Sequence, residues 1–139
     1  MSVTDPRHRL AESPRYLIYH THETAHLYIK GSRRADVVIG GFCGDPQTAC
    51  IAPDESYCVV AGSGLVLYFL QAPFADYAYG QTSANWREWG RTPTDIYWIE
   101  AVYSPEPATA IRFVVDPLDE VRQGVYELNT ADFTVEKLL

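Results

Sequence analysis

Short stretches of alternating apolar and polar side chains recur along this sequence about every ten residues, separated by turn-forming residues. Nine glycines and nine prolines leave few windows long enough for a helix. The pattern predicts an all-β chain, with a β-rich α+β chain as the alternative. We expect an antiparallel sandwich or barrel-like meander of about seven to ten short strands and one long aromatic-rich loop.

The length of 139 residues allows one domain. We expect a single β-rich domain over 15–139, preceded by a loosely held segment at 1–14. The expected strands are 15–21, 25–30, 35–40, 48–52, 57–62, 65–71, 95–103, 109–116, 124–129 and 132–138.

The chain is acidic, with 11 Lys and Arg against 18 Asp and Glu and a net charge of −7. This balance argues against a nucleic-acid partner, because neutralising phosphates needs clustered basic residues. No apolar run approaches the ~18–20 residues of a membrane span. No apolar segment follows Arg7 and Arg9, as a secretory signal would require. We therefore expect a cytoplasmic protein without a membrane partner.

Three cysteines, Cys43, Cys50 and Cys58, show no CxxC spacing. In a chain without an export signal they predict reduced, mostly buried thiols, and the alternatives are one disulfide or a reactive thiol. We expect no cofactor.

The long loop at 72–94 combines large aromatic side chains with charged residues. Such combinations are typical of protein interfaces. If residues 82–89 form a short helix, its two tryptophans, Trp86 and Trp89, project from one side. The alternative is a segment that caps the sheet with its aromatics turned inward. The expected partner-binding residues are Asp76, Tyr77, Tyr79, Trp86, Glu88, Trp89 and Asp95.

The only metal-like cluster contains His20, His22 and His26. Its geometry depends on the hairpin register. Pairing Thr21 with Thr24 puts His20 and His26 on opposite faces of the sheet, whereas a loop one residue longer puts them opposite each other. The first register also sets apolar residues against each other, so we expect ordinary turn histidines and no metal site.

No arrangement of residues predicts catalysis. Ser63 between Gly62 and Gly64 lacks the spacing of a nucleophile elbow, and we expect a hairpin turn there. Joining 95–103 to 109–116 through residues 104–108 sets Val102 opposite Ala110. Glu100 then faces Arg112 as a structural ion pair, and the alternative is a general acid whose pKa desolvation raises. The sequence leans away from an enzyme without deciding the question.

Two stretches, 49–68 and 124–135, resemble the hairpins of β-propeller blades, with a Pro-Asp turn at Pro53 and Asp54 in the first. A closed propeller needs at least about four blades of roughly forty residues, so one chain of this length does not form one. The resemblance implies antiparallel sheet.

In size, acidity and lack of catalytic motifs the chain resembles the immunity proteins of bacterial toxin systems. The resemblance implies a non-catalytic protein-binding module that neutralises a toxin partner with a basic surface by covering it. The alternatives are a small-ligand-binding or hydrolytic β-barrel that uses the aromatic loop, and a structural subunit of an oligomer.

Overall fold

The computed structural model describes residues 7–105 and 109–139, which form three four-stranded antiparallel sheets and one two-stranded ribbon. The first sheet contains β1 (His8–Glu12), β2 (Tyr16–Thr21), β3 (Thr24–Ile29) and β4 (Val37–Gly41). The second contains β5 (Thr48–Ile51), β6 (Tyr57–Gly62), β7 (Gly64–Phe69) and β8 (Trp86–Trp89). The ribbon of β9 (Arg91–Thr92) and β10 (Asp95–Ile96) leads to the third sheet, which contains β11 (Ile99–Tyr103), β12 (Ala110–Val115), β13 (Gly124–Asn129) and β14 (Val135–Lys137).

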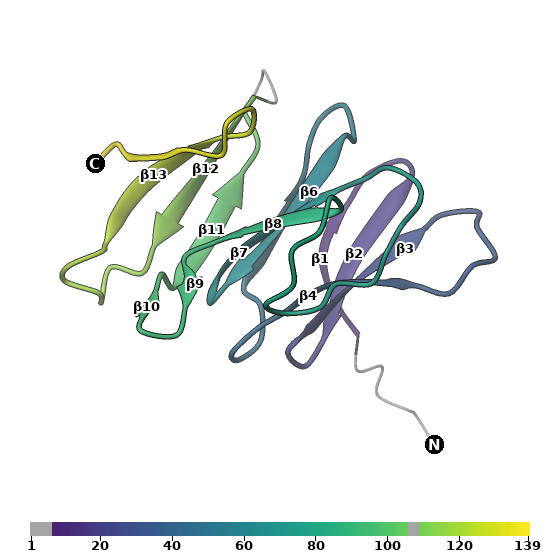
Figure 1. Cartoon of the computed structure of the whole chain (residues 1–139), viewed down its shortest axis with the longest axis horizontal. Helices are drawn as coiled ribbons and strands as arrows, with labels where there is room; N and C mark the ends of the chain where they lie inside the picture. Colours follow the sequence, from purple (N-terminus) through teal and green to yellow (C-terminus); the bar gives the residue numbers. More distant parts are fainter. Residues whose placement is uncertain (1–6, 106–108) are drawn as a thin grey trace.

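The all-β prediction is confirmed, and the described residues contain no helix and no closed barrel. Within those residues, accordingly, no helix is long and apolar enough to cross a bilayer. The three large sheets lie side by side in chain order, with the N-terminal sheet on the right and the C-terminal sheet on the left of Figure 1. β5 of the middle sheet packs against both β1 and β11.

The middle sheet is buried on both faces, and this fixes the layered arrangement. Val60 and Tyr68 belong to a core shared with the first sheet, whereas Val59 and Leu67 belong to a core shared with the third. Strands buried on both faces have continuous apolar sequences, as β6 and β7 do. The two outer sheets each bury one face, so the fold is a three-layered sandwich-like stack.

The N-terminal boundary differs from the expected one. Residues 8–12 form β1, which pairs with β2 in the first sheet. The expectation that 1–14 is loosely held is therefore wrong for β1, and residues 1–6 lie outside the described residues. The alternating pattern was too short there to mark a strand.

The expected ion pair between Glu100 and Arg112 is wrong. Val102 pairs with Phe113 and not with Ala110, so Tyr103 lies opposite Arg112, and Glu100 itself lies at a β-bulge between Ile99 and Ala101. Arg112 instead contacts Glu127 on β13, with 2.9 Å between Nε and Oε2. Residues 106–108 of the expected hairpin connection lie outside the described residues.

The hairpin of β2 and β3 has the register expected from its apolar residues, with Thr21 opposite Thr24. His20 and His26 therefore lie on opposite faces of the first sheet. His20 stacks on His8 at 5.0 Å between ring centroids, and His26 stacks on Tyr19 at the same distance. The expected turn at Ser63 is also confirmed, because Gly62 pairs with Gly64.

Candidate functional site

Exposed large apolar side chains gather in the C-terminal third of the chain. Among the described residues, all but one of them lie within 98–139, and they are Trp98, Tyr103, Leu118, Val121, Leu138 and Leu139. Leu118 and Val121 are 87% and 81% exposed in the loop between β12 and β13. Exposed apolar side chains that cluster in this way mark candidate interaction surfaces.

The loop between β12 and β13 holds these side chains on a fixed backbone. Oδ1 of Asp116 accepts a hydrogen bond from the N–H of Leu118 at 2.8 Å. Oδ1 of Asp119 accepts two more, from Val121 at 3.1 Å and Arg122 at 3.0 Å. Aspartates that bond the backbone two or three residues ahead stabilise turns. The loop is therefore ordered although its apolar side chains face solvent.

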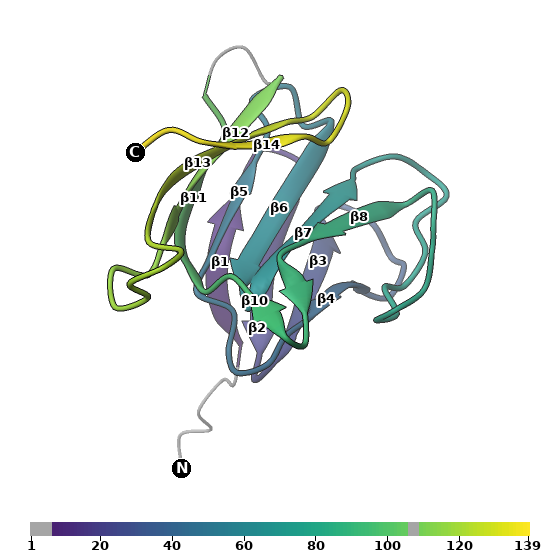
Figure 2. The same ribbon diagram turned by 60° about the vertical axis from the view of Figure 1, so that its left-hand side comes forward.

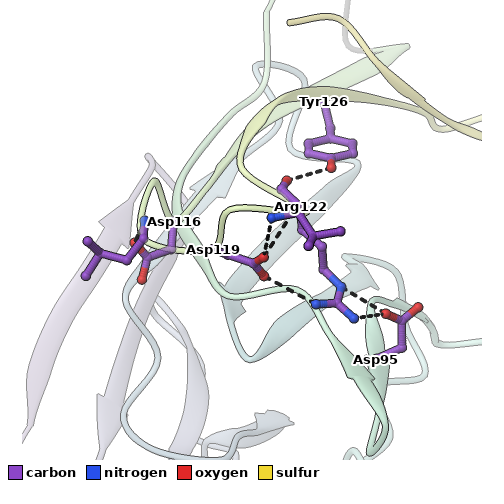
Figure 3. Close-up of polar contacts among 7 residues, drawn as sticks. Asp95, Asp116, Asp119, Arg122 and Tyr126 are labelled. Carbon is purple, nitrogen blue, oxygen red and sulfur yellow. Dashed lines mark hydrogen bonds and ion pairs between the residues drawn. The ribbon is translucent and has the colours of Figure 1, made fainter.

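Arg122 anchors the end of this loop, as Figure 3 shows. Its Nε lies 2.9 Å from Oδ1 of Asp95, and its Nη1 lies 3.4 Å from Oδ2 of Asp119. Tyr126 donates a hydrogen bond from its hydroxyl to the Arg122 carbonyl at 2.6 Å. The loop is thus fixed both to the β9–β10 ribbon, drawn as two short green arrows beside the β10 label in Figure 2, and to β13.

The charge of Asp119 follows from the same contacts. Hydrogen bonds from the backbone N–H groups of Arg122 and Val121 lower its pKa below the ordinary value, although partial desolvation opposes the shift. Asp119 is therefore a carboxylate at neutral pH.

Trp98 extends this surface towards the middle sheet. The Asp116 N–H donates to the Trp98 carbonyl at 2.8 Å, which joins the loop to the segment before β11. Trp98 is 42% exposed. We call the combined patch the β12–β13 surface; it consists of Trp98, Leu118 and Val121 with the carboxylates Asp95, Asp116, Asp119 and Glu120.

The aromatic residues expected at the partner surface lie mostly in the cores. Residues 86–89 form β8 and not a helix, so Trp86 and Trp89 point to opposite faces of the middle sheet. Trp86 is 6% exposed and packs on Tyr77, which is also buried. The expectation of Trp86 as an exposed anchor is therefore wrong, because strand alternation turns its ring inward. The alternative, a segment with inward aromatics, describes this part of the loop.

The charged residues of the same loop hold the structure together. Oδ1 of Asp76 accepts a hydrogen bond from the Val38 N–H at 3.0 Å. Glu88 accepts from the Tyr77 hydroxyl and from Arg91 Nε, the latter at 2.9 Å. Of the expected set, Tyr79 is exposed and Asp95 belongs to the β12–β13 surface, so partner binding by these two stays a prediction.

A pocket lies beside Arg91, between the ends of β3 and β4 and the β9–β10 ribbon. The pocket has a volume of about 500 Å³ and is lined by Phe42, Cys43, Tyr79 and Arg91 among others. The Arg91 guanidinium donates to the carbonyls of Gly41 and Ser63 as well as to Glu88. These contacts commit the guanidinium to joining neighbouring turns and to Glu88, so its place in the pocket is explained by the fold.

The remaining candidate groups are the histidines and the three cysteines. In the described part of the chain, no three His, Cys, Asp or Glu residues are arranged to hold a metal ion. All three cysteines are free; Cys58 is buried and Cys43 is exposed, so the expectation of mostly buried thiols does not hold for Cys43. Burial raises the pKa of Cys50 to about 12 and also raises that of Cys58, which keeps both protonated.

No protein-family model and no curated protein matches this sequence. The roles of individual residues therefore follow from the geometry of the β12–β13 surface and from its charge.

Proposed function

We propose that this chain is a non-catalytic, acidic protein-binding module that covers a basic surface of its partner, in the manner of an immunity protein that neutralises a toxin. The observation that carries the proposal is the exposure of Leu118 and Val121 on a loop whose backbone is already fixed. A preordered loop loses little conformational entropy on binding, so its apolar contacts contribute more fully to affinity.

The net charge of the chain indicates the sign of the charge on the partner's surface. The net charge is −7, and Asp116, Asp119 and Glu120 flank the two exposed apolar side chains. Complementary charge around an apolar centre accelerates association and selects against acidic partners. A partner with a basic surface fits this arrangement best.

The experiment compares three forms of the protein as baits in cell extract of the native host. They are the wild type, the double variant Leu118→Asp/Val121→Asp, and the control Tyr103→Asp. Tyr103 is also exposed but lies at the opposite end of β11 from the β12–β13 loop. Circular dichroism first establishes that all three are folded.

We expect the wild type and Tyr103→Asp to capture the same basic protein, identified by mass spectrometry. The double variant should bind the purified partner at least about thirtyfold more weakly, because replacing a central anchor typically costs about 2 kcal/mol or more. Equal binding by the double variant would place the interface elsewhere and contradict the proposal.

A further inference from the structure

A second pocket adjoins the β12–β13 surface on the side of the middle sheet. It has a volume of about 360 Å³ and lies between the connection from β4 to β5, the turn from β6 to β7 and the start of β11. The partly exposed Trp98 lines it. The backbone of Trp98 is fixed there by a bridge to Ser63 and by the hydrogen bond from Asp116.

The charge at this pocket is uncompensated. Asp45, Glu100 and Asp116 line it, and each comes from a different segment of the chain. Within residues 7–105 and 109–139, none of the three forms an ion pair. Glu100 reaches the pocket from the bulge in β11, and bulges redirect side chains in this way.

An aromatic face beside carboxylates is the chemistry that recognises an organic cation. The negative face of an indole attracts an ammonium or guanidinium group, and the surrounding carboxylates strengthen the attraction. The pocket beside Arg91 differs in this respect, because its own guanidinium already lies 4.6 Å from the centroid of the Phe42 ring. A second cation is therefore favoured less there than in the pocket at Trp98.

We propose that the pocket at Trp98 takes a lysine or arginine side chain of the partner, while neighbouring apolar side chains of the same partner segment pack on Leu118 and Val121. This inference rests on the proposed function and specifies the chemistry of the partner: a segment in which a basic residue stands close to apolar ones. The long alkyl stem of either basic side chain lies along the indole while its charged end meets the carboxylates.

The test uses two matched probes, the amides of Nα-acetyl-lysine and of Nα-acetyl-norleucine, which differ in the ammonium group. Each is titrated at millimolar concentration into ¹⁵N-labelled protein. The indole N–H resonance of Trp98, assigned with Trp98→Phe, and the backbone amide of Asp116 report binding. We expect both signals to move with the lysine probe and to stay unchanged with the norleucine probe.

Three variants locate the effect. Trp98→Ala should weaken binding of the lysine probe about fivefold, read from the Asp116 amide, because an exposed cation–π contact is lost. The double variant Asp45→Asn/Glu100→Gln should also weaken it, by about fivefold. Glu136→Gln, on β14 and not part of the pocket lining, should leave it unchanged. Equal shifts with both probes, or undiminished lysine binding in the pocket variants, would overturn the inference.

The outcome separates this inference from the proposed function. If the Leu118/Val121 variant loses the protein partner while the lysine probe fails to bind at Trp98, only the pocket assignment is wrong. If the lysine probe binds at Trp98 but the Leu118/Val121 variant keeps the partner, the pocket assignment stands and the proposed interface is wrong.

Discussion

Nε of Arg122 lies 2.9 Å from Oδ1 of Asp95, so the loop that carries Leu118 and Val121 is tied to the β9–β10 ribbon. The Asp95 side chain is 54% exposed, and water screens a pair at such a position. The contact therefore orders the loop and contributes little to global stability. It makes the conformation of the apolar pair depend on a residue more than twenty positions earlier in the chain.

The first prediction concerns this contact. Arg122→Ala removes the guanidinium but keeps the carbonyl to which Tyr126 donates. We expect faster hydrogen exchange at the amides of Val121 and residue 122, measured by NMR, with nearly unchanged global stability. Arg112→Ala is the control, because it breaks a different exposed ion pair, the one between Arg112 on β12 and Glu127 on β13. Equal exchange in wild type and Arg122→Ala would show that the aspartates alone order the loop.

The second prediction distinguishes the core tryptophan from the surface one. Trp86 is 6% exposed, stacks on Tyr68 and packs against the tilted ring of Tyr77, so Trp86→Ala should lower the free energy of unfolding by about 3–5 kcal/mol in urea titrations. Its Nε1 has no hydrogen-bond partner among residues 7–105 and 109–139, so Trp86→Phe should cost less. Trp98→Ala should change stability by about 0.5 kcal/mol or less. A Trp86→Ala variant as stable as Trp98→Ala would contradict this assignment.

The third prediction concerns acid stability at Glu55, in the turn between β5 and β6. Its carboxylate accepts hydrogen bonds from the Ser13 hydroxyl at 2.5 Å and from the Arg15 N–H at 3.0 Å, which connects the first two sheets. These contacts, the Ser13 bond foremost, lower the pKa of Glu55 below its ordinary value of 4.5. The stabilisation is therefore complete above about pH 4.5 and is lost as the pH falls through the lowered pKa.

We accordingly expect wild type to unfold at a higher temperature than Glu55→Gln at pH 7. The difference should shrink as the pH falls below 4.5, in thermal melts at a series of pH values. Ser13→Ala should reproduce part of the effect, because it removes the main cause of the shift. A difference that stays constant into acid would mean that the Glu55 carboxylate is not the group responsible.

Local hairpins were the part of the fold that the sequence predicted well. Each of the ten expected strands overlaps an observed one, and the β2–β3 register follows from a short turn between apolar faces. β8 was missed because it pairs with β7 across a long connection, and four residues carry too little alternation to mark a strand. The bulge at Glu100 was missed because the alternation of apolar and polar side chains predicts the face of the sheet on which a residue lies only where the strand has no extra residue.

The candidate site was harder to predict, because composition does not distinguish a buried aromatic from an exposed one. Trp86 stands between the polar Asn85 and Arg87 yet is buried, whereas Trp98 stands between Tyr97 and Ile99 yet is exposed, so only the packing of the three sheets decides which ring meets water. A local signal did exist at Leu118 and Val121, since two apolar residues stand among aspartates and a proline in a turn. Apolar residues in such a turn lie on the surface, because connecting segments run outside the core.

The last prediction concerns Gly64, where the turn from β6 to β7 meets the segment after β8. Its φ is +73° and its backbone is crowded: an added Cβ would lie 2.6 Å from the Gly90 carbonyl oxygen and 2.7 Å from that of Trp89. Gly80 serves as the control, because its φ is +76° and nothing lies within 4 Å of an added Cβ. Gly80→Ala therefore carries only the left-handed backbone strain, about 1–2 kcal/mol.

Gly64→Ala carries the same strain and the overlap with two carbonyls, so we expect a loss of about 2–5 kcal/mol in the free energy of unfolding. Gly64 also donates its N–H to the Tyr97 carbonyl at 2.7 Å, so the variant should weaken this hydrogen bond to the segment before β11. Urea titrations of both variants measure the two losses. Equal losses would show that the close approach of Gly90 and Trp89 relaxes without cost, and that the conformation at Gly64 alone requires glycine.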